Sequence, residues 1–280
     1  MKLGYGNYGM KGVALADLAG GLARLGYEAF EVCVMDGWPS HPDNIDADER
    51  RRLRKSLADA SLEFTAALGG YKVLVPSDDL PAQVEAFRAA CRLLHELTDK
   101  PTPVITSTLG GGGPTDWDTG KRFVGDRCVL FADAALEEEC CFAVEAHIGG
   151  ILDVPDRVAW LLTQYQHPAL RANFDISHFL ANGCDMATSI ALVAPYGVHA
   201  HVKDSTLIDG KVRFLLPGEG TTDYAKYFQL LGEAGWKLPV TVEVSQQVFT
   251  RAGYKPWEAA AFCFTVLDKA RHEAGARSVG

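Results

Sequence analysis

Four segments of the sequence place an acidic or imidazole side chain at the end of a short run of β-forming residues. These side chains are Glu145, Asp175, His201 and Glu243. Three carboxylates and one imidazole are oxygen and nitrogen donors, which suit Mn²⁺, Mg²⁺ or Co²⁺ better than a thiolate-rich zinc site would, with Zn²⁺ as the alternative ion. One such residue alone is more often a structural hydrogen-bonding partner than a ligand. Four of them on consecutive predicted strands indicate one divalent metal site.

The elements that would position these side chains alternate along the whole chain. Candidate strands cover residues 2–5, 28–34, 62–68, 103–107, 141–146, 170–174, 197–203 and 239–244. Amphipathic helical stretches lie near 12–25, 48–58, 80–98, 120–138, 155–166, 184–194, 222–234 and 256–272. Strict alternation predicts a parallel α/β sheet, and eight repeats favour a closed (β/α)8 TIM barrel over an open sheet. The strand ends of such a barrel meet at its mouth, so the four candidate ligands should converge there.

The bulk composition agrees with one globular domain over residues 1–280. A chain of 280 residues is normal for one closed barrel, and it contains no linker or low-complexity segment. Hydrophobic residues make up 48% and charged residues 22%, which is a globular balance. The formal net charge of −9 would repel polyanions, so we expect no nucleic-acid partner.

Cysteine usage and hydropathy predict a cytoplasmic protein. The seven cysteines include no CxxC pair and lie mostly in apolar runs, as buried thiols do in a reducing compartment. The N-terminal segment has no apolar signal core, and no stretch approaches the ~20 apolar residues that a membrane span requires. We therefore expect no membrane partner.

Further motifs around the candidate ligands resemble a known superfamily. In order, they are LARLGYEAFEV at 22–32, VEAH at 144–147, NFDISHF at 173–179, HAHVKDS at 199–205, PGEGTTDY at 217–224 and VTVEV at 240–244. Together they resemble the xylose-isomerase-like TIM barrels, a superfamily of sugar phosphate isomerases and epimerases that also includes endonuclease IV. The likeness covers nearly the whole chain and is greatest to the ketose 3-epimerases.

This resemblance assigns roles to individual residues. The matched metal ligands are Glu145, Asp175, His201 and Glu243. Glu145 and Glu243 would also be the catalytic pair, one removing a proton from the sugar and the other delivering one to the opposite face. His178 matches the histidine, three residues after the aspartate ligand, that contacts the substrate.

Other positions match residues that contact the substrate or support the ligands. These are His147, Lys203 and Asp204. Lys203 could offset the excess negative charge of the site, or it could form a structural ion pair with Asp204 or Asp175. Glu31 resembles the acid that ends the family's second strand, although it could equally be structural.

The sequence departs from endonuclease IV at strands three and four. That enzyme needs additional histidine ligands there to build a three-metal cluster. Here the third predicted strand leads into Ala67-Leu68-Gly69-Gly70 and the fourth ends in Thr106-Ser107-Thr108, without an imidazole. The comparison favours a single metal ion and argues against a nuclease.

The resemblance implies a divalent-metal-dependent sugar isomerase or epimerase of carbohydrate metabolism. It would abstract a proton next to a carbonyl and pass through an enediolate intermediate. The alternative is a metal-dependent dehydratase or lyase on an inosose-type or 3-keto sugar, because both reactions begin with the same proton abstraction. A nuclease or a non-catalytic barrel is the third hypothesis.

The loops should select a small-molecule carbohydrate substrate. Aromatic and polar loop residues that could pack on a sugar or close the barrel mouth are Trp38, His41, Trp117, Arg251 and Tyr254. The glycine run 110–113 is followed by Pro114, and no GK[ST] motif occurs, which favours a non-phosphorylated sugar. Residues that could form a homo-oligomer contact are Trp236, Trp257 and Phe262.

Overall fold

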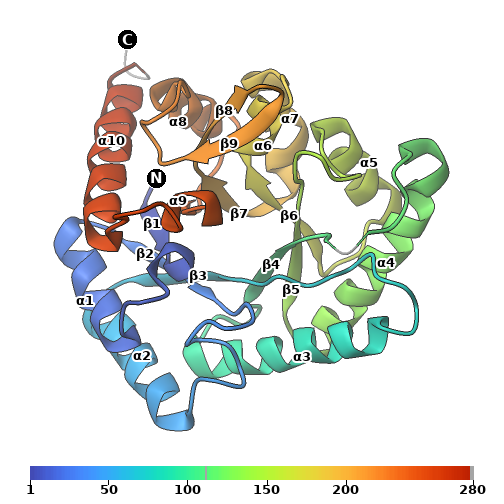
Figure 1. Ribbon diagram of the computed structural model, residues 1–280, viewed down its shortest axis with the longest axis horizontal. Helices are drawn as coiled ribbons and strands as arrows, with labels where there is room; N and C mark the ends of the chain where they lie inside the picture. Colours follow the sequence, from blue (N-terminus) through green and yellow to red (C-terminus); the bar gives the residue numbers. More distant parts are fainter. Residues whose placement is uncertain (111, 278–280) are drawn as a thin grey trace.

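Eight parallel strands close into a barrel in the computed structural model, which describes residues 1–110 and 112–277 (Figure 1). Their order around the barrel is β1-β10-β7-β6-β5-β4-β3-β2. The strands are β1 Leu3–Gly6, β2 Ala29–Cys33, β3 Glu63–Leu68, β4 Val104–Thr108, β5 Cys141–Glu145, β6 Leu170–Asp175, β7 Gly197–Val202 and β10 Val240–Val242. The predicted (β/α)8 barrel is confirmed. Gly111 of the glycine run lies outside the described residues.

Helices connect the strands and surround the barrel (Figure 1). The long ones are α1 Leu15–Leu25, α2 Ala47–Asp59, α3 Leu80–Leu97, α4 Trp117–Glu137, α5 Pro155–Tyr165, α7 Met186–Val193, α8 Tyr224–Glu233 and α10 Pro256–Arg277. Short helices follow three strands or precede one: η1 Asn7–Met10, α6 Ile176–Ala181, η2 Ala194–Tyr196 and α9 Gln246–Phe249. None of the helices in the described part of the chain combines the length and apolarity that crossing a membrane requires.

Local sequence signals explain where several helices begin and end. Asp46 caps α2, because its carboxylate accepts a hydrogen bond from the Glu49 amide while the Glu49 side chain accepts one from the Asp46 amide. Helix α1 ends at Gly26, whose φ of 103° is a left-handed conformation. A Cβ at this position would also lie 2.3 Å from the Phe264 ring, so glycine is required there.

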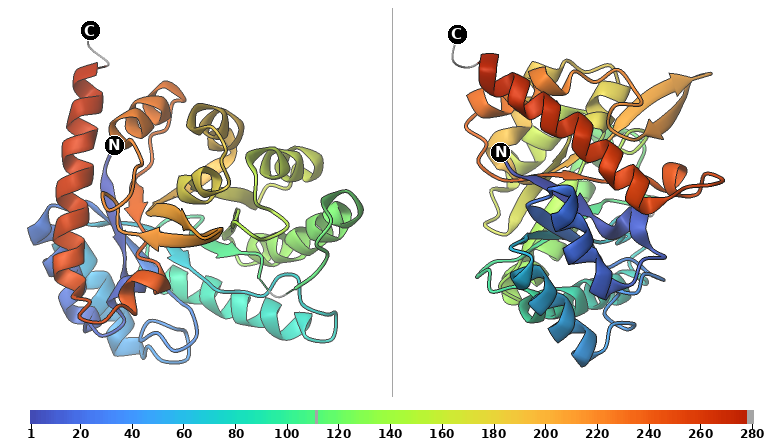
Figure 2. Two further views of the ribbon diagram at one scale, coloured as in Figure 1. Left: turned by 45° about the horizontal axis from the view of Figure 1, so that its top comes forward. Right: turned by 90° about the vertical axis from the view of Figure 1, so that its left-hand side faces the viewer.

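A two-stranded hairpin follows β7 and was not among the predicted elements. Strands β8 (Asp204–Ile208) and β9 (Lys211–Leu215) pair in antiparallel fashion. The turn residues Asp209 and Gly210 have φ values of 49° and 70°, the positive values of a type I′ turn. The Asp-Gly dipeptide between two runs of β-forming residues would therefore have predicted this hairpin from the sequence. The hairpin projects from the body of the barrel (Figure 2, right).

The barrel interior is filled by small apolar side chains below the polar mouth. Ala66, Val104, Cys141 and Ala143 form a cluster separate from the large core between sheet and helices. Because side chains alternate along a strand, Cys141, Ala143 and Glu145 share the face of β5 that points inward. Glu145 thus stands at the mouth, directly above a packed apolar floor.

Candidate metal centre and substrate cavity

The four predicted ligands converge at the carboxyl ends of neighbouring strands. Glu145 ends β5, Asp175 ends β6, His201 lies near the end of β7 and Glu243 directly follows β10. One nitrogen or oxygen atom from each lies within 4.8 Å of the corresponding atoms of the others. All four residues are buried. Strand register produces this convergence, since Asp175 pairs with His201 across β6 and β7.

Lys203 places a cation among these acids. Its ammonium donates hydrogen bonds to Asp175 Oδ2 and, at 2.5 Å, to Glu243 Oε2. From the sequence, an ion pair of Lys203 with either Asp175 or Asp204 was expected if the lysine is structural. The partner in the structure is Asp175 and not Asp204. Burial by itself would lower the pKa of the Lys203 ammonium, but Asp175, Glu243 and Glu145 raise it. Lys203 is therefore charged and partly balances the acidic cluster.

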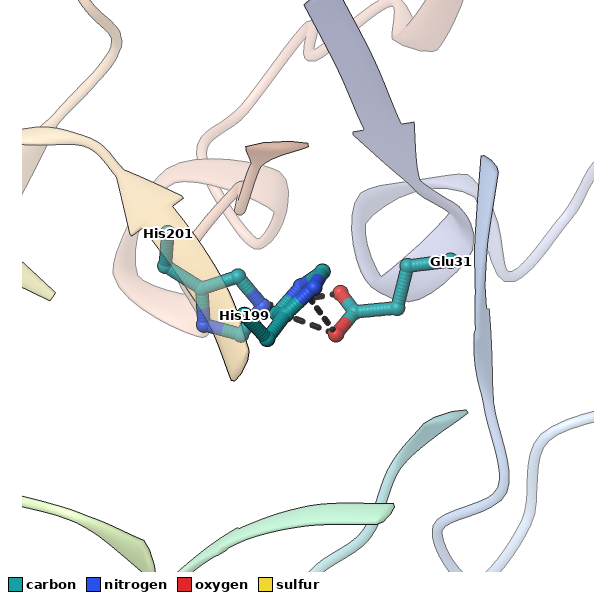
Figure 3. A group of neighbouring side chains, drawn as sticks. All are labelled: Glu31, His199 and His201. Atoms are coloured by element: carbon teal, nitrogen blue, oxygen red, sulfur yellow. Dashed lines mark hydrogen bonds and ion pairs between the residues drawn. The ribbon is translucent and has the colours of Figure 1, made fainter. Parts of the chain in front are cut away.

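His201 links the ligand cluster to a second buried group. Its Nδ1 lies 3.1 Å from Glu145 Oε2 and 3.4 Å from Glu243 Oε2. Its Nε2 lies 2.8 and 2.9 Å from the two carboxylate oxygens of Glu31 on β2. His199 Nε2 also lies 3.1 Å from Glu31 Oε1, so the carboxylate faces both imidazoles (Figure 3).

The second group, Glu31, His199 and His201, has an ion-binding composition of its own. However, the two groups share His201, and its Nε2 already lies within hydrogen-bond distance of both Glu31 oxygens. Burial alone would raise the pKa of Glu31, but the charges of His201 and His199 lower it to about 2. Glu31 is thus an anion that fixes His201, in the manner of carboxylates that orient metal-binding histidines.

Asn173 lies in the site, although no role was predicted for it from the sequence. Its amide nitrogen lies 2.9 Å from His201 Nδ1 and donates to Glu145 Oε2. Its Oδ1 atom is buried and has no hydrogen-bond partner among the described residues. Its place in the sequence, two residues before Asp175, could have indicated this role. Residues two apart on a strand point to the same face, so Asn173 should point into the barrel as Asp175 does.

His178 and His147 lie beside each other above Glu145, with ring centroids 4.2 Å apart. The Ile148 amide donates to His178 Nδ1 at 3.4 Å, which leaves the proton on Nε2. This Nε2 lies 3.3 Å from Glu145 Oε1, and within the described part of the chain it makes no well-aligned hydrogen bond. His178 therefore presents a buried donor at the metal cluster.

Two cavities meet at the cluster. The smaller, of about 300 Å³, is lined by the predicted residues Glu145, His147, His178, Lys203 and Glu243. Residues from other elements that complete its wall include Tyr8, Leu68, Thr108, Phe214 and Gln246. The larger, of about 650 Å³, shares Thr108, Glu145 and His147 with it. Phe214 comes from the unpredicted hairpin, and its ring centroid lies 5.0 Å from that of His178.

Several predicted positions lie away from the two cavities. The Asp204 carboxylate accepts hydrogen bonds from the Gly218 and Gly220 amides at 2.7 and 3.0 Å, and so it holds the PGEG loop. Arg251 bonds Glu219 and the Phe214 carbonyl, which fixes the base of the hairpin.

The aromatic loop residues also make contacts within the protein. Trp38 stacks on Tyr8, with ring centroids 5.1 Å apart. Trp117 packs against Trp160. Tyr254 lines a separate surface groove.

The electrostatics of the two cluster glutamates differ. Burial alone would raise the pKa of Glu145, but the adjacent imidazoles of His178 and His201 hold it well below its usual range. Burial also raises the pKa of Glu243, where the charge of Lys203 opposes the shift and that of Glu145 adds to it. Three buried carboxylates and an imidazole around one point form a donor set that fits a divalent cation, because such a cation offsets the excess negative charge.

Comparison with known proteins identifies the family. The family described as xylose isomerase-like TIM barrel matches residues 21–262. The chain belongs to this family. A curated relative, 3-dehydroshikimate dehydratase from Bacillus anthracis, is 23% identical over 189 residues. That match covers 66% of this chain and 64% of the relative, so it spans less than two thirds of the relative's length.

Solved structures extend the likeness over the whole barrel. L-ribulose 3-epimerase superposes with a TM-score of 0.77 at 15% identity, covering 99% of this chain and 96% of that one. The IOLI protein with a bound zinc atom has a TM-score of 0.80 at 15% identity, covering 98% of this chain and 99% of that one. At these identities the likeness concerns the fold. The proteins of similar sequence or fold include an epimerase and a dehydratase, so family membership alone does not define the reaction.

Proposed function

We propose that the protein is a divalent-metal-dependent isomerase or epimerase that moves a proton next to the carbonyl of an uncharged keto sugar. The observation that carries this proposal is the placement of Glu145 and Glu243. Both line the smaller cavity, and each lies within 3.4 Å of His201 Nδ1. A sugar in this cavity meets two carboxylates at one reacting centre, as proton removal and return require.

Glu145, Asp175, His201 and Glu243 would hold the ion. When bound, a divalent cation supplies Lewis acidity that polarises a carbonyl and stabilises developing negative charge. One of the two glutamates removes the proton from the carbon next to the carbonyl, and the other returns a proton to the opposite face. His178 donates its free Nε2–H to the oxygen on which negative charge develops.

The lining of the cavities supports an uncharged substrate. Among the described residues that form the two cavity walls, Lys203 is the only lysine or arginine, and its ammonium is bonded to Asp175 and Glu243. Phosphate and carboxylate groups are normally bound through free cationic donors. The sugar is therefore proposed to carry neither group in these cavities.

Elimination of water from an uncharged keto sugar is the second candidate, which the dehydratase relative favours. A substrate such as 3-dehydroshikimate carries a carboxylate, and the described residues of the cavity walls offer it no free lysine or arginine. The two candidates share the first proton abstraction and differ only in whether a hydroxyl group then leaves.

Incubation of the metal-loaded protein with keto sugars in D₂O tests the function. We expect deuterium at the carbon next to the carbonyl and an epimeric or isomeric product. An unsaturated product absorbing in the ultraviolet would favour the dehydratase. No carbon-bound exchange with any keto sugar would overturn both proposals.

The metal site is tested separately by Glu243→Gln, with the exposed Glu233→Gln as the matched control. We expect Glu243→Gln to lower bound metal in elemental analysis and to abolish exchange, because it removes both a ligand and a catalytic carboxylate. If Glu243→Gln keeps the wild-type metal content and the full rate of deuterium exchange, Glu243 is neither a metal ligand nor a catalytic residue.

A further inference from the structure

The two cavities at the metal cluster form one continuous binding region. They share Thr108 at the end of β4, Glu145 at the end of β5 and His147 just beyond it. The proposed reacting groups lie in the smaller part. A molecule whose reacting carbon lies beside Glu145 can therefore extend into the larger part without leaving the protein.

The larger cavity is built by the loops that follow β4 and β5. Its wall combines apolar side chains, among them Leu74, Ile148 and Leu152, with the hydroxyl groups of Thr108 and Thr115. Such a mixture suits the C–H faces and hydroxyl groups of a polyhydroxylated ring. The volume of about 650 Å³ is greater than the 300 Å³ that holds the reacting groups, so the region accepts more than a single sugar ring.

The charges around the larger cavity favour an uncharged substituent over an anionic one. No lysine or arginine occurs among the described residues of its wall, and its one ionisable acid is Glu145. The nearby N-terminus of α4 is occupied by the Asp116 carboxylate, which accepts a hydrogen bond from the Thr119 amide at 3.0 Å. This helix end thus offers no free anion site of the usual kind.

Two glycines in the wall of the larger cavity border open space. Gly112 and Gly149 have φ values of 92° and 81°, which side chains rarely tolerate. No atom of the described residues, apart from each glycine's chain neighbours, lies within 4 Å of a Cβ built on either glycine, so both positions border open space.

We propose that the substrate is a keto sugar carrying an uncharged glycosidic substituent, and that this substituent lies in the larger cavity. The inference rests on the proposed function, because it places the reacting ring beside Glu145 and Glu243. It goes further by assigning Ile148 and Thr115 as residues that determine specificity for the substituent.

The test compares matched sugars in the deuterium-exchange assay. The pairs are D-fructose with 6-O-glucosyl-D-fructose, and 3-keto-D-glucose with 3-keto-maltose, while fructose 6-phosphate is the anionic probe. Ile148 is half-buried in the wall of the larger cavity, so Ile148→Trp should place a large side chain in that cavity. Ile148→Val is its conservative control. Thr115→Trp approaches from an exposed position, so it provides a second variant if the first fails to fold.

For the wild-type protein we expect kcat/KM to be at least about tenfold higher for the glycosylated member of one pair. Ile148→Trp and Thr115→Trp should lower kcat/KM for the glycosylated sugar relative to that for the free sugar and so remove this preference, whereas Ile148→Val should retain it. Exchange of the free sugars without any preference would overturn the inference but not the proposed function, and so would a preference that survives both tryptophans. A preference for fructose 6-phosphate would also overturn the inference. If no sugar exchanges, the proposed function fails and the inference falls with it.

Discussion

The Glu31 carboxylate lies 2.8 and 2.9 Å from Nε2 of His201, while His201 Nδ1 points at the ligand cluster. A carboxylate on Nε2 keeps a proton there and leaves Nδ1 free to bind a metal ion. Glu31 is therefore a positioning residue, which acts through His201 without lining either cavity.

We expect Glu31→Ala to weaken metal affinity by about 10- to 100-fold, the range found for residues that orient metal-binding histidines. Glu31→Gln should recover part of the loss, because its amide oxygen can still accept from Nε2–H. Competition with a chromophoric chelator measures the affinity. Equal affinity in the wild type and both variants would rule out the positioning role, and equal loss in both would point to a general structural defect.

Lys203→Met should destabilise the metal-free protein, because it leaves Asp175 and Glu243 buried without their cation. Removal of one partner from a buried ion pair costs about 3–5 kcal/mol. A bound divalent ion supplies the missing positive charge, so the metal-induced rise in Tm should be larger in the variant than in the wild type. The exposed Lys226→Met is the control for loss of a lysine. An equal metal-induced rise in both proteins would contradict this explanation.

Phe214 on the hairpin packs its ring against His178 and lies 5.3 Å from the Lys203 ammonium. Contacts between aromatic rings contribute about 0.5–1.5 kcal/mol. Phe214→Ala should therefore lower kcat/KM up to about tenfold, because His178 loses the wall that holds it. Leu207→Ala on the same hairpin replaces a side chain that is 57% exposed and should leave activity unchanged. Steady-state kinetics of both variants separate the two expectations, and equal effects would remove the role of Phe214.

Glu63 begins β3 and binds the segments that precede β1 and β4, away from the site, through hydrogen bonds from Lys2 and Lys100 at 3.0 and 3.1 Å. Burial would raise the pKa of Glu63, but these two lysines lower it. A lowered pKa in the folded state means that the ion pairs stabilise the protein above the unfolded pKa. This contribution is lost as the pH falls from about 4.3 through the lower folded value.

Glu63→Gln should thus reduce the free energy of unfolding at pH 7 by no more than about 1 kcal/mol, since the pairs are partly exposed to solvent. The difference from the wild type should vanish in acid. Denaturant unfolding at pH 7 and near pH 3 measures both values, and deuterium exchange activity should not change. A difference that persists unaltered at low pH would show that the ion pairs are not its cause.

Much of the fold could be predicted from the sequence because local patterns encode it. The alternation of β-forming runs with amphipathic helices predicted the eight barrel strands and the eight long helices. Position at a strand end also predicted the convergence of Glu145, Asp175, His201 and Glu243, since all parallel strand ends meet at one mouth. The hairpin was missed because its Asp-Gly turn was included in a presumed connection.

Two adjacent residues show which contacts could not be predicted from the sequence. Lys203 and Asp204 resembled a pair with related roles, yet Lys203 bonds the cluster acids while Asp204 bonds Gly218 and Gly220 in a loop. The reason is the alternation of side chains at the end of an extended strand, which sends neighbouring residues to opposite faces.

The sequence by itself thus determined the barrel and the chemical types of the four candidate ligands. Only the tertiary structure decided how they are supported and what space they face. Glu31 and His201 are 170 residues apart and come from strands that are not neighbours in the barrel. Their contact exists because the closed sheet brings inward-facing side chains together across its interior, and no local pattern encodes that distance. The two cavities likewise arise from loops that meet only after the barrel has closed.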